Sequence, residues 1–113
     1  MSKLETIKVY KTANFRVTVD ALEEDSPDLS WDETGEVIKG INDGTFMLFC
    51  ARVRVEHFQL GIVAEDYLGN CIYKDAQDFI KNSGYFVSMI HDCCHRARVS
   101  ISAMRLPAMR LPT

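Results

Sequence analysis

The chain has no long run of apolar residues. A hydrophobic share of 47% over 113 residues is enough for the core of one domain, but no stretch approaches the roughly 18 apolar residues of a membrane span. The opening Met1-Ser2-Lys3 leads into an amphipathic stretch, whereas a signal peptide has an apolar core. We therefore expect a cytoplasmic protein that has no contact with a membrane.

Cysteine is too scarce and too irregularly placed for a disulfide framework. The four cysteines are Cys50, Cys71, Cys93 and Cys94, and the adjacent last two cannot easily pair with each other. In a reducing compartment all four are expected to be free thiols.

Lysine and arginine are missing between Asp20 and Ile38. This segment holds eight of the chain's 16 acids, namely Asp20, Glu23, Glu24, Asp25, Asp28, Asp32, Glu33 and Glu36. After Phe79 the sign reverses, and one acid, Asp92, stands against Lys81, Arg96, Arg98, Arg105 and Arg110. Poles of opposite sign predict oriented contact with a charged partner. The alternative is that two solvated surfaces merely differ in sign.

The chain also lacks the side-chain patterns of a catalytic or cofactor site. No glycine-rich loop followed by Lys-Ser/Thr is present to hold a phosphate. His91, Cys94 and His95 place soft donors on one helix face, but a zinc site needs a fourth ligand from elsewhere. Thiol catalysis by Cys94 would need an orienting group and an oxyanion site that no motif supplies. We expect no enzyme, no catalytic residue, no metal and no cofactor.

Basic residues interleaved with aromatic residues, which are typical of RNA-binding surfaces, are sparse. Arg52 and Arg54 on one strand face could touch a phosphate backbone, but the chain has a net charge of −3. Such arginines more often solvate a sheet, and direct binding to nucleic acid is not expected.

Three segments have the pattern of strands. Alternation of Phe15, Val17 and Val19 with polar residues predicts a strand at 14–21. The segment 45–57 begins apolar and then alternates, which predicts burial on both faces at its start and on one face at its end. A hairpin leads to a third strand, 60–67, which is expected to end at the turn Leu68-Gly69-Asn70. The simplest sheet is antiparallel, in the order of the chain or a close variant, with 45–57 central.

Two helices are predicted near the C-terminus. Asp75 is expected to cap a short helix, Ser83-Gly84 to end it, and a long helix to run from about Tyr85 to Ala103. The side of the long helix that is expected to pack on the sheet has Phe86, Met89, Ile90, Cys93, Ala97 and Met104. The opposite side, expected in solvent or against a partner, has His91, Cys94, His95 and Arg98.

One more short helix is predicted within the acidic segment. Ser30 and Glu33 fit a capping box, and the helix would end by Gly40. The residues expected to face inward from this region are Trp31, Val37, Ile38 and Ile41.

Together these elements predict a single α+β domain over residues 1–104. It would consist of a three-stranded antiparallel sheet, a long C-terminal helix packed on one face, and one or two short helices. Residues 105–113 contain a duplicated Ala-Met-Arg-Leu-Pro, whose Pro107 and Pro112 disrupt a helix. We expect this segment to be a flexible tail.

The chain resembles small uncharacterised proteins of bacterial phages and mobile elements, through Glu65–Tyr73, Asp78-Phe79, Gly84-Tyr85-Phe86 and Met89. Those proteins have a DYLGGC-Y turn, a DF in a short helix and a GYF at the start of a terminal helix. Here Asn70 replaces the second glycine, Ser88 stands where an acid is usual, and the Cys-Cys-His of the helix is additional. The likeness covers roughly residues 46–98.

This resemblance implies a non-enzymatic protein of a phage or mobile element, in the cytoplasm of a bacterial host. Small acidic phage proteins without an active site commonly occlude a host protein, as anti-CRISPR inhibitors do. The implied partner is a host defence protein or nucleoprotein complex, whose phosphate-binding groove carboxylates can occupy. The expected partner-binding residues are Asp28, Trp31, Asp32, Glu33 and Glu36. The alternative is a small regulatory protein that binds metal or nucleic acid; the oligomeric state stays open.

Overall fold

The computed structural model describes residues 2–110, with side chains as far as residue 104. Within that part the chain forms one four-stranded antiparallel sheet and three helices, so the α+β class is confirmed. The elements are β1 (Lys3–Lys11), β2 (Phe15–Leu22), α1 (Glu36–Asp43), β3 (Met47–His57), β4 (Gly61–Tyr73), α2 (Ala76–Asn82) and α3 (Tyr85–Arg110). No helix of the described residues is long and apolar enough to cross a membrane.

The prediction of three strands was wrong, because it missed β1. The sheet has the order β1-β2-β3-β4, with each strand next to its neighbour in the chain. β1 is an edge strand, rich in lysine and almost wholly exposed, as edges that avoid further pairing often are. Its pairing with β2 shifts between Lys3 and Glu5 and again between Thr6 and Lys8. These shifts break the period of two that reveals a strand in a sequence.

β3 is a central strand, as predicted, and pairs with β2 without a register shift from Phe15–His57 to Leu22–Cys50. The predicted turn at Leu68-Gly69-Asn70 was wrong, because β4 continues to Tyr73. The register of β3 with β4 shifts at this point, and Asn70 has a φ of 51°. The turn-forming residues therefore make a bulge within a long strand.

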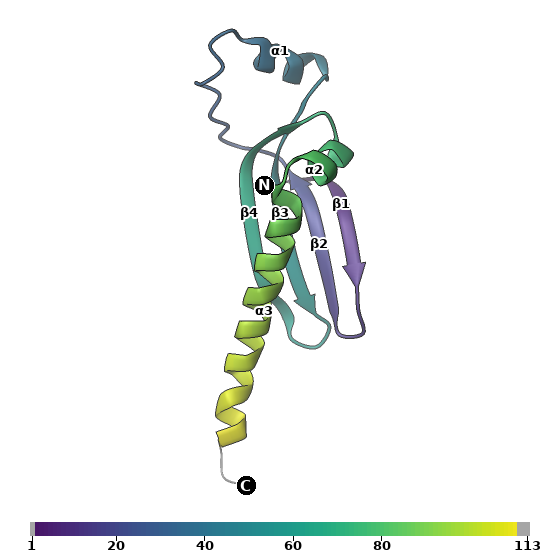
Figure 1. The fold of residues 1–113 in the computed structure, drawn as a ribbon, viewed down its shortest axis with the longest axis vertical. Helices are drawn as coiled ribbons and strands as arrows, with labels where there is room; N and C mark the ends of the chain where they lie inside the picture. The colour runs from purple at the N-terminus through teal and green to yellow at the C-terminus, as the bar shows by residue number, and fades with distance from the viewer. Residues whose placement is uncertain (1, 111–113) are drawn as a thin grey trace.

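α3 packs on one face of the sheet, mainly over β3 and β4 (Figure 1). The predicted packing of this helix on the sheet is confirmed: Phe86 and Cys93 are buried in one core with Val53 and Val55 of β3, and Ile90 packs at its edge. The Cys93 thiol lies 3.8 Å from the carbonyl oxygen of Val53. This core fixes α3 against the central strand.

The ends of the two C-terminal helices follow their capping residues. Asp75 caps α2 as predicted, since its carboxylate accepts a hydrogen bond from the N–H of Asp78 at 2.8 Å. The Ser83 hydroxyl accepts from the N–H of Tyr85 at 3.0 Å, and Gly84 has a φ of 73°. α3 runs past its expected end at Ala103.

The predicted flexible tail, 105–113, lies partly within α3, which ends at Arg110. Its last three residues, 111–113, lie outside the described residues. The boundary of the domain at 104 therefore stays a prediction.

The inner face of α3 was predicted correctly except at its end. Four residues of the expected set are buried, namely Phe86, Met89, Cys93 and Ala97, whereas Met104 is exposed. On the opposite side His91, His95 and Arg98 are exposed, but Cys94 is half-buried against the core. The side of α3 that faces the sheet therefore includes Cys94.

The capping box at Ser30 and Glu33 was wrong. α1 begins at Glu36, after Gly35 with a φ of 73°, and runs past the predicted end at Gly40 to Asp43. Gly40 lies within the helix, at a position where a Cβ would overlap the ring of Phe46. The prediction that Trp31 and Ile38 face inward was also wrong, since both are exposed.

Candidate partner-binding lobe

Residues 23–46 form a lobe that projects beyond the end of the sheet (Figure 1). The lobe consists of the segment after β2 and of α1, and it returns to the sheet at β3. We call it the acidic lobe, because it has eight carboxylates and one base, Lys39. All five residues predicted to bind a partner, Asp28, Trp31, Asp32, Glu33 and Glu36, lie in it.

The bulge at Asn70 of β4 anchors the acidic lobe to the sheet. The backbone N–H of Asn70 donates to the Glu24 carboxylate at 2.8 Å, and its side-chain amide donates to the carbonyl oxygen of Asp28 at 3.0 Å. The N–H of Asp28 donates back to the side-chain oxygen of Asn70 at 3.3 Å. Asparagine tolerates the left-handed backbone of this position better than most residues. This role of Asn70 was not predicted, and its only signal in the sequence is an Asn after Gly next to a strand pattern.

Asp28 organises the turn that presents Trp31. Its carboxylate accepts hydrogen bonds from the Ser30 hydroxyl at 2.7 Å and from the Ser30 N–H at 3.1 Å, and these bonds lower the pKa of Asp28. The indole N–H of Trp31 donates to the carbonyl oxygen of Asp28 at 3.0 Å. The Trp31 side chain is nevertheless 55% exposed, so its ring is oriented but not covered.

Asp32 joins this turn to α1. Its carboxylate accepts from the N–H of Ile38 at 2.9 Å and so satisfies one of the unpaired donors at the start of the helix. The Ile38 side chain is 40% exposed. Trp31 and Ile38 are therefore two exposed apolar side chains of the acidic lobe. Asp32 serves as a structural residue as well as a predicted contact.

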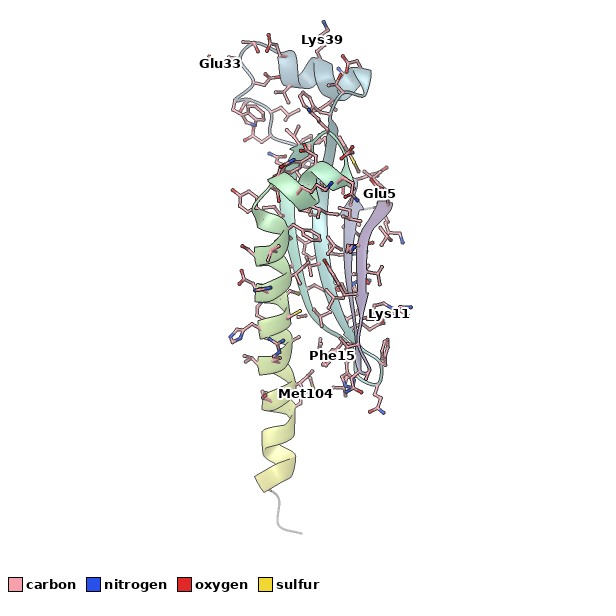
Figure 2. All side chains as sticks on the ribbon, turned by 45° about the vertical axis from the view of Figure 1, so that its right-hand side comes forward. Glu5, Lys11, Phe15, Glu33, Lys39 and Met104 are labelled. Carbon is pink, nitrogen blue, oxygen red and sulfur yellow. The ribbon has the colours of Figure 1, made fainter. Side chains whose placement is uncertain are left out.

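The acidic lobe has a far more negative charge than the chain as a whole. Eight carboxylates against one lysine give it −7, which leaves +4 for the rest of a chain of net −3. Figure 2 shows Glu33 and Lys39 in the lobe at one end and Met104 toward the other end. Asp20 does not contribute to this surface, because it is only 3% exposed and pairs with Arg52 at 2.8 Å.

The two arginines considered for nucleic acid lie on the face of the sheet opposite α3, and carboxylates neutralise both. Arg52 pairs with Asp20, and Arg54 lies 3.2 Å from the Glu65 carboxylate. Glu65 also accepts from the Tyr67 hydroxyl at 2.7 Å, and this bond lowers the pKa of Glu65. The positive charge of each arginine is therefore balanced by a neighbouring carboxylate.

The His91, Cys94 and His95 group does not come together as a ligand set. Cys94 is half-buried toward the sheet, whereas both histidines are exposed. Among the described residues no three His, Cys, Asp or Glu side chains are placed to hold a metal ion. Burial raises the pKa of Cys71 and of Cys93 to about 11, which keeps these two thiols protonated near neutral pH.

Comparison with family models, with curated proteins and with solved structures found no match for this chain. The fold and the candidate site together describe an α+β domain with a projecting acidic lobe.

Proposed function

We propose that this chain is a non-enzymatic protein of a phage or mobile element, which binds and inhibits a host defence protein of the CRISPR type through its acidic lobe. The observation that carries the proposal is the concentration of eight carboxylates and one lysine in a projecting lobe with an exposed tryptophan. The likeness of residues 46–98 to proteins of phages and mobile elements supports the class of partner.

The charge of the lobe suits a groove built for nucleic acid. Proteins of this kind hold phosphates with lysine and arginine, and a dense set of carboxylates matches that potential. Attraction between the two surfaces speeds diffusional encounter and weakens as salt screens it. The partner would then be unable to bind its nucleic acid while the lobe is in place.

Trp31 supplies an apolar anchor among the charges. Tryptophan is enriched among the residues that dominate binding energy at interfaces. Here its indole N–H is already bonded to the backbone of Asp28, so its side chain loses less freedom on binding than an unrestrained one. The anchor is thus arranged before the partner arrives.

The test is capture of purified CRISPR effector complexes by the immobilised chain, at low and at high salt. Glu33→Lys with Glu36→Lys should reduce capture at low salt at least tenfold, because it reverses two exposed charges of the lobe. The matched control is Glu5→Lys with Asp92→Lys, which makes the same charge change at exposed positions outside the lobe. Equal loss in both variants, or no capture by the unaltered chain, would contradict the proposal.

The alternative of a regulator that binds metal or nucleic acid has no specific observation in its favour. Arg52 and Arg54 are paired with carboxylates. Among the described residues, the histidines and cysteines of α3 do not form a group that could hold a metal ion.

A further inference from the structure

α3 covers only half of the sheet on its own face. An α-helix with its side chains is about 10–12 Å across, whereas neighbouring strands are about 4.8 Å apart, so one helix covers roughly two strands. α3 packs mainly over β3 and β4, which leaves the β1 side of the sheet, including the first half of β2, less covered beside it (Figure 1).

A groove runs along α3 over this less covered side. It consists of a cavity of about 320 Å³ and a second of about 130 Å³, which share Val17 and Cys94. The first is lined by Tyr10, Phe86, Val87 and Ile90, and the second reaches Phe15 and Ala97. From residue 86 to residue 98 of α3 the groove is about 18 Å long. We call it the α3 groove, and its walls are largely apolar.

The charged residues at the rim of the α3 groove are basic. Arg98 lies at one end of the groove, and the imidazole of His91 lines it about midway along α3. The Lys8 ammonium lies 5.8 Å from the centre of the Tyr10 ring, which is itself part of the wall. No Asp or Glu is among the residues that line either cavity. The groove thus suits an apolar segment that has acids at its sides.

The acidic lobe is such a segment. It exposes Trp31 and Ile38. Asp32 and Glu33 directly follow Trp31 in the sequence, and Glu36 precedes Ile38 by two residues. A chain cannot fill its own groove, because Asn70 holds the lobe at one end of the sheet. The groove runs toward the opposite end, where Phe15 lies (Figure 2).

We propose that the acidic lobe of one copy binds in the α3 groove of a second copy. Trp31 and Ile38 enter the apolar trough, and carboxylates of the lobe face Lys8 and Arg98 at its rim. The contact joins two different surfaces, so each pair keeps one free lobe and one free groove. Such a heterologous contact builds open chains or rings rather than a two-fold dimer.

This inference goes beyond the proposed function and does not rest on it. The two share the lobe, so a bound partner would compete with a second copy of the chain. Self-association without capture of an effector would leave this inference standing and contradict the proposed function. Capture by a chain that stays monomeric would do the reverse.

The experiment is sedimentation velocity of the full chain over a range of concentrations and salt. The expected result is a mass that grows with concentration at low salt and falls in high salt. Val87→Glu places a charge in the α3 groove and should weaken association about tenfold or more. Val99→Glu is the matched control, since Val99 is 55% exposed against 58% for Val87 but lines neither cavity. It should associate like the unaltered chain.

Mixing gives the decisive result. The Val87→Glu chain keeps its lobe, and a chain with Glu33→Lys and Glu36→Lys keeps its groove. Each alone should be monomeric, and an equimolar mixture should form a discrete heterodimer that grows no further. A monomeric unaltered chain at every concentration, equal effects of the two valine substitutions, or no heterodimer from the mixture would overturn the proposal. Circular dichroism should show that each variant is folded.

Discussion

Asp20 and Arg52 form the most buried ion pair among the described residues. Their atoms meet at 2.8 Å, and Asp20 also accepts from the Thr6 hydroxyl at 2.9 Å. In the sequence Asp20 belongs to the acidic segment, but the register places it directly opposite Arg52 on the neighbouring strand. Its charge is therefore used within the sheet, because cross-strand neighbours of opposite sign stabilise a pair of strands.

Removal of the Asp20 carboxylate should destabilise the fold strongly. Asp20→Ala leaves the mostly buried Arg52 guanidinium without its partner, and we expect a loss of about 3–5 kcal/mol in the free energy of unfolding. Urea denaturation measures this loss. The control is Glu56→Ala, which breaks the more exposed pair with Arg16 and should cost at most about 1 kcal/mol. Similar losses in both variants would show that burial of the Asp20 pair is not the cause.

At the scale of elements, the sequence predicted what local periodicity and caps determine. β2, β3, α2 and the start of α3 lie close to their expected positions, because their apolar spacing and capping residues are regular. β1 could not be found, because an exposed edge strand with two register shifts has no clean alternation. α1 was misplaced, because its start depends on the left-handed backbone of Gly35 and on a bond from the N–H of Ile38 to the Asp32 carboxylate, neither of which has the pattern of a capping box.

Asn70 also depends on contacts between distant parts of the chain, because its hydrogen bonds to Glu24 and Asp28 hold the acidic lobe to β4. Asn70→Gly keeps the left-handed backbone and the N–H that binds Glu24, but it removes both side-chain bonds to Asp28. We expect the lobe to open more readily by about 1–2 kcal/mol. Hydrogen exchange should then be faster in residues 26–35 and unchanged in β2 and β3. Unchanged exchange in the lobe would show that other contacts hold it.

At the scale of the whole molecule, charge is separated along an elongated shape. The longest dimension is 67 Å, and the acidic lobe lies at one end with a charge of −7 against +4 for the rest. The sequence showed that acids and bases are segregated, but not that the acids project as a lobe. The α3 groove was not predictable either, since it depends on the unpredicted β1 and on a helix that covers only half of a wider sheet.

This separation should be visible on an anion exchanger at neutral pH. Glu33→Lys with Glu36→Lys and Glu5→Lys with Asp92→Lys both change the net charge from −3 to +1, since each substitution adds two charges. Retention depends on the local field of an accessible patch as well as on net charge. The variant with the intact lobe should therefore elute at higher salt than the variant with the altered lobe. Elution at the same salt would show that the lobe is no more accessible than the rest of the surface, and the reason for preferring it as the binding site would be gone.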